Sequence, residues 1–355
     1  MNEPKTSRET RAGRDVVNVA VVGLGFMGVT HLKAYLKAPG ARIVAVCDSV
    51  RVPVNGILAG VQGNVTGSGD LDLGREVKVC RELQAVLAEP EVDLVDLCVP
   101  TPLHVEQSLA SLRQGKHVLC EKPLALSTDQ AREIVNAART ARGFFMPAMC
   151  MRFWPGWAWL KQIVEKNTYG KVLSAGFRRL SAAPAWSAAT YSAASSNGGA
   201  LLDLHIHDTD FVQFLFGRPR GVFSTGIARD GAFPDHVLTQ YLFPGGPVVH
   251  AEGGWLLAKG FHMSYTLHCE KATLDYNLAR GAEALHVIES GRDLQVIKFD
   301  DPDGYAVEIR YLLEAIRTGQ PPRVVTAQDG LSAIEICEAE AASVRTGKIV
   351  ELGKG

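Results

Sequence analysis

The sequence predicts an α/β protein with a doubly wound parallel sheet in its first half and a second, α+β domain behind it. The length of 355 residues exceeds the usual size of one domain. In the first half, short apolar runs alternate with amphipathic stretches, a pattern typical of β-α-β units. Residues 261–269 alternate strictly between apolar and polar side chains, which indicates a half-exposed antiparallel strand. We therefore expect a flexible arm over 1–15, a first domain over 16–150 and a second over 151–355.

The first domain follows from apolar runs of strand length separated by helical patterns. The predicted strands are residues 18–23, 42–48, 92–100, 117–123 and 144–150. The predicted helices are residues 27–38, residues 127–139 and an amphipathic segment that ends at Gly115. Residues 51–78 are rich in glycine, valine and asparagine, and we interpret them as a helix remnant with a surface insertion.

The second domain is rich in strand patterns and ends in two helices. Further strand-length runs occur at residues 172–180, 220–229, 236–243, 247–255 and 272–277. The Pro-Gly-Gly-Pro segment at 244–247 predicts a hairpin turn between two of them. The predicted helices are residues 198–217, 308–317 and 327–345.

Composition excludes several classes of protein. The formal net charge is −1, so no basic excess favours nucleic acid or an anionic membrane as a partner. No apolar stretch is long enough to span a membrane, and because the first fifteen residues are polar we expect no signal peptide among them. The seven cysteines never form C-x-x-C. We expect reduced thiols in the cytoplasm and no metal site.

A G-x-G-x-x-G motif follows the first strand and opens the first helix. It consists of Gly23, Gly25 and Gly28, with Phe26 and Met27 inside it. The first glycine permits a tight turn, the second lets the backbone approach a pyrophosphate, and the third lets helix and strand pack closely. The helix N-terminus then offers its N–H groups to the phosphates. This position between strand and helix predicts a dinucleotide-binding Rossmann domain.

Three further side chains are candidates to contact the cofactor. Asp48 ends the second strand, where a carboxylate accepts hydrogen bonds from the ribose and repels a 2′-phosphate, so we predict NAD. The alternatives are that the nearby Arg51 also admits NADP, or that Asp48 is an ordinary strand-end carboxylate. Thr101 and His104 follow the strand at 92–100 and are candidates to line the cofactor. A plain turn with a helix N-terminus is an equally supported interpretation.

Two groups of residues carry candidate chemistry. Glu121, Lys122 and Pro123 end the fourth strand, which extends the lysine ammonium over the ligand crevice, while the proline stiffens the turn. Asp203 and His207 lie four residues apart on a predicted helix and share a face. A carboxylate beside an imidazole makes an acid–base pair, because the carboxylate can hold the ring and its proton. The alternative is a solvated helix face with structural salt bridges.

With these motifs the chain resembles the Gfo/Idh/MocA family of sugar and inositol dehydrogenases, from about Val16 onward. The similarity rests on GLGFMG (23–28), AVCD (45–48), PTPLH (100–104), GKHVLCEKPLA (115–125), MRFWP (151–155) and GGALLDLHIHDTD (198–210). The order and separation of the E-K-P and G-G-x-L-x-D motifs are specific for this family. The resemblance implies a Rossmann domain followed by a large, mostly antiparallel open sheet, through which members form homodimers or homotetramers.

The resemblance also implies roles for individual residues. The catalytic residues of the family fall on Lys122, Asp203 and His207. Substrate contacts are expected from these three and from Arg152 and Trp186, and cofactor contacts from Glu121 and Lys122. The chain departs from the family pattern in three ways: His205 stands where glycine is common, the segment after Asp48 is long, and the loop 182–197 is unusual.

The resulting hypothesis is an NAD-dependent oxidoreductase that acts on a secondary alcohol of a sugar, inositol or related polyol. His207 would take the hydroxyl proton while a hydride passes to the nicotinamide, and Lys122 would stabilise the oxygen. One alternative is a glycoside hydrolase that uses transient oxidation and elimination with tightly held NAD. A second is an NAD-binding protein without catalysis.

Overall fold

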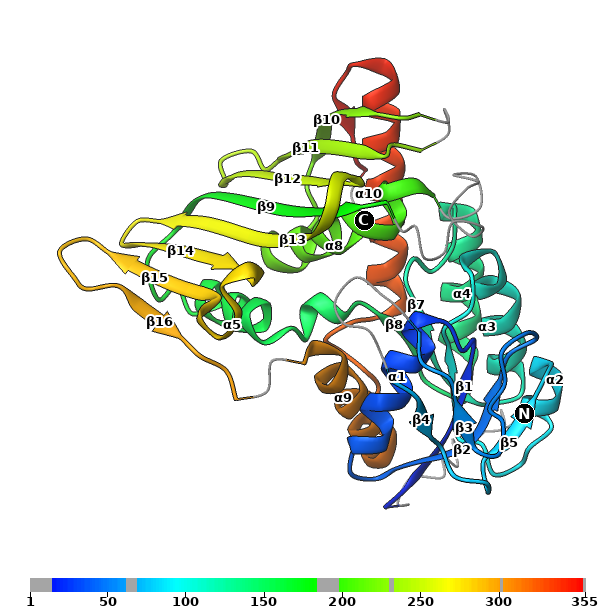
Figure 1. The fold of residues 1–355 in the computed structure, drawn as a ribbon. Helices are drawn as coiled ribbons and strands as arrows, with labels where there is room; N and C mark the ends of the chain where they lie inside the picture. Colours follow the sequence, from blue (N-terminus) through cyan, green and yellow to red (C-terminus); the bar gives the residue numbers. More distant parts are fainter. Residues whose placement is uncertain (1–14, 62–68, 184–197, 230–232, 301–302, 354–355) are drawn as a thin grey trace, which may run out of the picture.

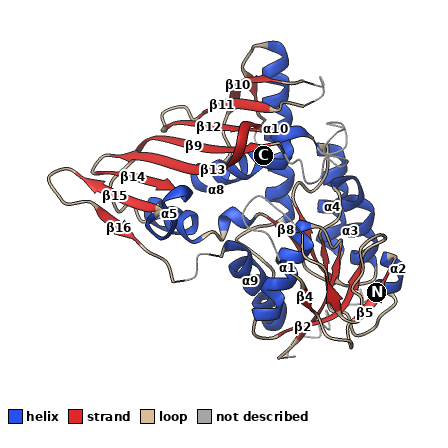
Figure 2. Ribbon diagram, viewed as in Figure 1, coloured by secondary structure: helices blue, strands red, loops and turns tan. Residues whose placement is uncertain are grey.

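The computed structural model describes residues 15–61, 69–183, 198–229, 233–300 and 303–353 (Figure 1). A six-stranded sheet and a nine-stranded sheet lie in two adjoining parts of the molecule, as the colouring by secondary structure makes plain (Figure 2). The predicted fold class is therefore confirmed. The predicted N-terminal arm, apart from Asp15, lies outside the described residues.

The first sheet is parallel throughout and has the order β5-β2-β1-β6-β7-β8. Its strands are β1 (Val17–Val22), β2 (Ala41–Cys47), β5 (Lys78–Cys80), β6 (Leu94–Leu97), β7 (His117–Glu121) and β8 (Phe145–Ala148). Its helices are α1 (Phe26–Lys37), α2 (Leu83–Leu87), α3 (His104–Arg113) and α4 (Thr128–Thr140). Every residue of β1 is buried, because helices cover both faces of a parallel sheet. This explains why the strand is an uninterrupted apolar run apart from Asn18.

The chain order of the strands reverses between β1 and β6, since β2 lies on one side of β1 and β6 on the other. In a doubly wound sheet, ligands bind outside the carboxyl ends of the strands at such a point. The segments that follow β1, β6 and β7 meet there. They carry Gly23, the turn at Thr101 and Lys122, respectively.

The second sheet is mixed and has the order β16-β15-β14-β13-β9-β12-β11-β10-β17. Its strands are β9 (Val172–Ala182), β10 (Gly221–Ile227), β11 (His236–Leu242), β12 (Val248–Gly254), β13 (Leu256–Cys269), β14 (Ala272–Asn277), β15 (Leu285–Glu289), β16 (Gln295–Ile297) and β17 (Val350–Glu351). Neighbouring strands pair antiparallel except β12 and β9, which are parallel. The turn predicted at 244–247 joins β11 to β12, as expected for a hairpin.

Helices cover one face of the second sheet, and aromatic rings fill the space between them. These helices are α5 (Pro155–Glu165), α8 (Ile206–Phe216) and α10 (Ala327–Thr346) (Figure 1). Trp157 of α5 is fully buried, and its ring centroid lies 4.8 Å from that of Phe211 and 5.2 Å from that of Tyr265. Helix α5 was not predicted, although Pro155 at its first turn and the apolar spacing to Leu160 are typical helix signals.

The last two helices return to the first domain. Helix α9 (Gly304–Thr318) packs against α1, and α10 packs against α4 (Figure 1). Ile309 and Leu312 of α9 and Leu331 and Ile334 of α10 belong to the same hydrophobic core as the parallel sheet. The part of the chain after residue 303 therefore ties the two domains together, whereas the sequence assigned it to the second domain alone.

The segment after Asp48 differs from its prediction. The described residues 51–61 and 69–78 contain no helix, so their interpretation as a helix remnant is wrong. They form a short antiparallel pair, β3 (Ile57–Leu58) with β4 (Leu71–Asp72), and lead into edge strand β5. Asn55 and Gly56 both have positive φ, which breaks any helix before it can start. In the described part of the chain, no helix has the length and hydropathy needed to cross a membrane.

Candidate active site

The glycine turn after β1 is constrained by close contacts at two of its three glycines. Gly23 has a φ of +90°, and a Cβ there would lie 2.4 Å from the carbonyl oxygen of Cys98. A Cβ on Gly28 would lie 1.8 Å from the carbonyl oxygen of Gly23. A Cβ on Gly25 would meet nothing within 4 Å. Two glycines thus permit the packing of strand, turn and helix, and the middle one leaves open space over the turn.

Phe26 and Met27 form the first turn of α1 beside this open space. Both are partly exposed, and the helix N-terminus has neither a side-chain cap nor an acidic residue in its first turn. The positive end of the helix is therefore not neutralised by its own side chains. An uncapped helix end facing open space fits the pyrophosphate of a dinucleotide.

Asp48 lies against the same turn and is held there by the backbone. Its carboxylate accepts hydrogen bonds from the N–H groups of Leu24 at 2.8 Å, Val50 at 2.8 Å and Arg51 at 2.9 Å. The Arg51 guanidinium donates to the carbonyl oxygens of Leu24 and Ala59. Both charged groups predicted to influence the choice of cofactor thus flank the glycine turn.

His104 lies at the start of α3 and joins the segments that follow β6 and β7. Its Nδ1 lies 2.7 Å from the carbonyl oxygen of Pro123, and its Nε2 lies 2.8 Å from that of Val99. The ring is 1% exposed. Burial lowers the pKa of His104, although the two carbonyls favour the protonated ring. His104 therefore holds the backbone of these two segments together, while Thr101 is part of the partly exposed turn before it.

Lys122 extends from the end of β7 to the segment after Gly199. Its ammonium donates to the backbone oxygen of Asp203 at 2.6 Å and to Asp203 Oδ1 at 3.0 Å. The peptide bond between Lys122 and Pro123 is cis. Burial alone would lower the pKa of Lys122, but the carboxylates of Asp203 and Glu121 raise it above its ordinary value. The lysine is therefore a fixed cation at the carboxyl edge of the parallel sheet.

His207 is the uncharged partner in this group. Burial, followed by the charges of Lys122 and Arg179, lowers the pKa of His207 well below its ordinary value. Its Nδ1 is buried and has no hydrogen-bond partner in the described structure. A neutral imidazole of this kind can accept a proton. The hydrogen bonds described for Asp203 come from Lys122, so the predicted support of the His207 ring by Asp203 stays a prediction.

The helix that carries Asp203 and His207 begins with a π-helical turn. Residues Leu201–His205 are π-helical, and α8 follows from Ile206 to its end before Gly217. The sequence predicted one continuous α-helix over 198–217. In a π turn the residues per turn increase, so Asp203 is rotated relative to its α-helical position. It meets Lys122, a residue of the other domain.

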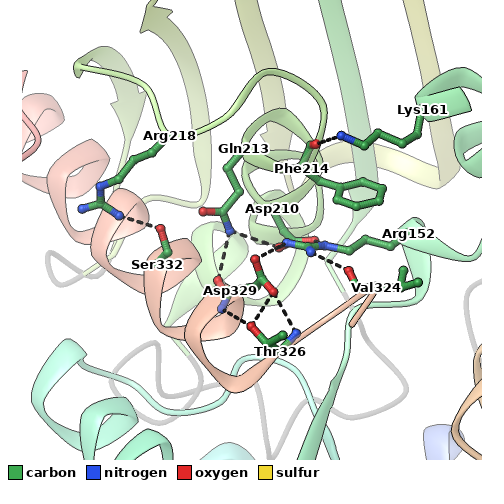
Figure 3. A network of polar contacts seen from close by, with 10 residues as sticks. All are labelled: Arg152, Lys161, Asp210, Gln213, Phe214, Arg218, Val324, Thr326, Asp329 and Ser332. Carbon is green, nitrogen blue, oxygen red and sulfur yellow. Dashed lines mark hydrogen bonds and ion pairs between the residues drawn. The ribbon is translucent and has the colours of Figure 1, made fainter. Parts of the chain in front are cut away.

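Arg152 was predicted to contact substrate, and the structure places it in a buried ion pair (Figure 3). Its Nε and Nη2 donate to the Asp210 carboxylate at 2.8 and 2.6 Å, and its Nη1 donates to the carbonyl oxygen of Val324 at 2.8 Å. The guanidinium also lies 4.5 Å from the centroid of the Phe214 ring. These contacts join the segment before α5 to α8 and to the segment before α10. The predicted substrate contact of Arg152 stays a prediction.

Two other residues singled out in the sequence are Trp186 and His205. Trp186 lies outside the described residues. His205 is fully buried between the second sheet and α10, with its Nε2 3.3 Å from Tyr241 Oη and 3.4 Å from Glu340 Oε2. A Cβ on Gly253 would lie 2.6 Å from the ring, so the side chain packs tightly there. His205 therefore packs between β12, Tyr241 of β11 and Glu340 of α10.

His31, Asp96 and Cys98 bring three metal-ligating side-chain types together in the described part of the first domain. His31 Nδ1 lies 2.8 Å from Asp96 Oδ2, which is a hydrogen-bond distance. Ligand atoms of a tetrahedral zinc site lie about 3.3 Å apart, given metal–ligand bonds of about 2.0 Å. The Cys98 thiol also donates to Asp96 at 3.4 Å. The group is thus closed by its own hydrogen bonds.

Comparison with known proteins identifies the family. Residues 17–148 match a family model described as an oxidoreductase family with an NAD-binding Rossmann fold. Residues 157–275 match the Gfo/Idh/MocA C-terminal domain. The chain belongs to the Gfo/Idh/MocA family. It is an NAD-dependent oxidoreductase, and the predicted family, cofactor and enzyme class are confirmed.

Individual relatives show how the family members differ. Inositol 2-dehydrogenase from Mycolicibacterium smegmatis is 28% identical over 358 residues, which cover 95% of this chain and 96% of the relative. A 2,7-anhydro-N-acetylneuraminate hydratase from Mediterraneibacter gnavus is 31% identical over 223 residues, 62% of this chain and 55% of the relative. The solved structure of levoglucosan dehydrogenase in complex with NADH has a TM-score of 0.78 at 21% identity and covers 95% of this chain and 99% of its own. That last likeness concerns the fold.

Sequence reasoning missed a buried cation near the candidate site of this Gfo/Idh/MocA protein. Arg179 of β9 is 3% exposed, and its guanidinium donates to both oxygens of the Asp208 carboxylate at 2.9 and 3.0 Å. Its charge contributes to the lowered pKa of His207. The signal was present: Arg179 occupies a core-facing position of β9, in phase with Ala175 and Phe177.

Proposed function

We propose that this enzyme transfers a hydride between NAD and a secondary alcohol of a sugar, inositol or related polyol. The observation that carries the proposal is the meeting of Lys122 with Asp203 beside the uncharged His207, at the carboxyl edge of a dinucleotide-binding sheet. The names of two relatives, an inositol 2-dehydrogenase and a levoglucosan dehydrogenase, support the substrate class.

Each side chain has a distinct part in the proposed chemistry. The nicotinamide supplies the acceptor or donor of the hydride when NAD is bound. His207, which is neutral at physiological pH, takes the proton of the substrate hydroxyl. The Lys122 ammonium holds the same oxygen and stabilises the negative charge that develops on it. Asp203 keeps the ammonium in place and raises its pKa, so the lysine remains a cation throughout.

The cofactor fits the residues that are present. The open space over Gly25 and the uncapped start of α1 accommodate the pyrophosphate. Asp48 supports NAD rather than NADP, since its carboxylate repels a 2′-phosphate, while Arg51 next to it leaves a weaker use of NADP within the proposal.

The proposal is tested by assaying the full chain with NAD against a panel of polyols, aldoses and anhydro-sugars. With an active substrate, Lys122→Met and His207→Ala should each lower kcat by about 10²- to 10³-fold while NAD binding changes little. Lys161→Met is the matched control, because Lys161 also binds a backbone oxygen and a carboxylate, those of Phe214 and Glu165. Unchanged turnover in both site variants contradicts the assignment.

A second reaction class is favoured by the anhydro-sugar hydratase among the relatives. In that class NAD is oxidant and reductant within one cycle, so a glycoside or anhydro-sugar is converted without net NADH. Accumulation of NADH with a free polyol supports the dehydrogenase, and substrate turnover without NADH supports the alternative. NAD binding without turnover of any member of the panel supports the non-catalytic alternative.

The nine-stranded sheet provides the surface for the homodimer or homotetramer that we propose. Its outward positions include the exposed apolar side chains Leu238, Val248 and Ile288. Light scattering of the purified chain measures the oligomeric state, and Leu238→Lys with Ile288→Lys should shift it toward the monomer. A cytoplasmic location is part of the same proposal, because all seven cysteines are free thiols.

A further inference from the structure

A buried histidine links the cofactor helix to the lysine turn. His31 lies on α1 and is fully buried. Its Nδ1 lies 2.8 Å from Asp96 Oδ2 on β6, and its Nε2 lies 3.2 Å from Glu121 Oε1 at the end of β7. The second contact is an ion-pair distance rather than an aligned hydrogen bond. One imidazole thus bridges two acidic side chains from neighbouring strands.

The two contacts favour a charged ring. A carboxylate only accepts hydrogen bonds, and a neutral imidazole has one N–H group. If His31 were neutral, one of its nitrogen lone pairs would face a buried carboxylate, which is repulsive. Although burial alone would lower the pKa of His31, the charge of Asp96 raises it well above the ordinary value. His31 is therefore an imidazolium shared by Asp96 and Glu121.

Glu121 transmits this arrangement to Lys122. One oxygen of Glu121 faces His31, and the other accepts a hydrogen bond from the backbone N–H of Lys122 at 3.2 Å. The Glu121 side chain is 8% exposed. The orientation of its carboxylate therefore sets the backbone position from which the Lys122 side chain extends to Asp203.

Other titratable groups surround the ring from each packed element. Cys98, the residue after β6, lies 3.4 Å from His31 Nδ1, and Tyr35 lies one turn further along α1. From α9, Tyr305 has its ring centroid 6.3 Å from that of His31. Glu308 is fully buried, and burial raises its pKa well above the ordinary value, which disfavours its charged form. Asp96 and Glu121 are the groups that balance the imidazolium.

We propose that His31 is a positioning residue: held between Asp96 and Glu121, it fixes the Glu121 carboxylate and thereby places the Lys122 ammonium relative to the cofactor bound at the start of α1. Because α1 begins at the glycine turn, the same helix would hold the phosphates with its first turn and the lysine turn with its second. The catalytic consequence rests on the function proposed above for Lys122.

The first test is the kinetics of His31→Gln in the full chain. Loss of the bridge should lower kcat by about 10- to 100-fold, since small misplacements of a catalytic group cost this much, while the KM for NAD changes little. Glu121→Gln breaks the same contact from the other side and serves if His31→Gln fails to fold. Because both act through one contact, the double variant should be no slower than the slower single variant.

The control lies on the same strand. His117 begins β7, at the end opposite to Glu121, and its Nδ1 accepts a hydrogen bond from the Phe144 N–H at 3.0 Å. His117→Gln keeps an acceptor there and should retain kcat. The positioning role is overturned if folded His31→Gln keeps the kcat of the parent enzyme, or if the effects of the two single variants multiply in the double variant.

A chemical measurement separates this inference from the proposed function. Labelling with acetic anhydride, followed by mass spectrometry, compares the reactivity of Lys122 with that of Lys161 in the same molecule. A loosened lysine turn in His31→Gln should raise the ratio by roughly threefold or more. If Lys122→Met retains activity while the Lys122-to-Lys161 labelling ratio rises in His31→Gln, the proposed function fails and the positioning role stands. An unchanged ratio overturns the positioning role.

Discussion

The Arg152–Asp210 and Lys122–Asp203 ion pairs both join an earlier segment of the chain to the helical segment after Gly199, and they differ in how completely their charges are enclosed. Arg152 and Asp210 have side chains that are 2% and 1% exposed, and the guanidinium also contacts Val324 and Phe214 (Figure 3). Lys122 and Asp203 have side chains that are 13% and 23% exposed.

This difference in exposure indicates that one ion pair stabilises the fold and that the other is available for chemistry. An enclosed, bidentate pair has little capacity left for a ligand, and removing one partner leaves a buried charge uncompensated. A partly exposed pair can exchange one contact for a substrate oxygen at much smaller cost to the fold. We call Arg152–Asp210 the enclosed pair and Lys122–Asp203 the open pair. The adjacent His207, with an unpaired buried Nδ1, adds a proton acceptor to the open pair only.

Breaking the enclosed pair should have the largest effect on stability. Arg152→Met leaves the Asp210 carboxylate buried without its cation and should lower the free energy of unfolding by about 3–5 kcal/mol. Urea unfolding measures this change. Arg178→Met is the control, because the Arg178–Glu252 pair has a half-exposed guanidinium and should contribute about 0–1 kcal/mol. If both variants lose the same free energy of unfolding, burial of the ion pair does not determine its contribution to stability.

Breaking the open pair should affect turnover more than stability. Asp203→Asn removes the negative charge that holds the Lys122 ammonium, and we expect kcat to fall by about 10²-fold. The free energy of unfolding should change by less than about 1 kcal/mol, because both side chains retain contact with water. Steady-state kinetics and urea unfolding of the same preparation test both parts. Full activity with reduced stability would assign this pair a structural role.

A smaller effect tests whether the Lys122 charge of the open pair acts on the neighbouring His207. In Lys122→Met the pKa of His207, measured by NMR titration, should rise by about one unit, because one of the charges that depress it is gone. Burial remains, so the pKa stays below 6.5. His117, whose pKa burial lowers to about 4, is the internal control and should not move. If the pKa of His207 is the same in Lys122→Met as in the parent protein, the Lys122 charge does not act on the His207 ring.

The sign of the linked stability effect follows from the same depression. The folded protein holds His207 neutral at pH values where the unfolded chain binds a proton. The contribution of the neutral ring to the free energy of unfolding is therefore complete above the unfolded pKa of about 6.5. It is lost as the pH falls through the lower folded pKa. Lys122→Met should therefore narrow the pH interval over which this histidine destabilises the protein in acid.

Local parts of the site could be predicted because short-range sterics dictate them. Gly23 and Gly28 contact backbone atoms of their own strand–turn–helix unit or of the adjacent strand, so the motif predicts their roles. The predicted end of the helix at Gly217, with its positive φ, is confirmed for the same reason. By contrast, Arg152 and Asp210 are 58 residues apart, and no local pattern indicates that they meet.

The amino-acid sequence by itself determined the strand and helix periodicities, the glycine turn, the NAD-binding class and the identity of the residues that carry the candidate chemistry, since each depends on neighbours a few residues away. Only the tertiary structure decided which charges are enclosed and which stay open, that a π turn brings Asp203 to Lys122, and that α9 and α10 return to the first domain. Whether a charge is buried depends on elements that are distant in the chain and that exclude water from it. The periodicity along one helix or strand carries no information about these elements.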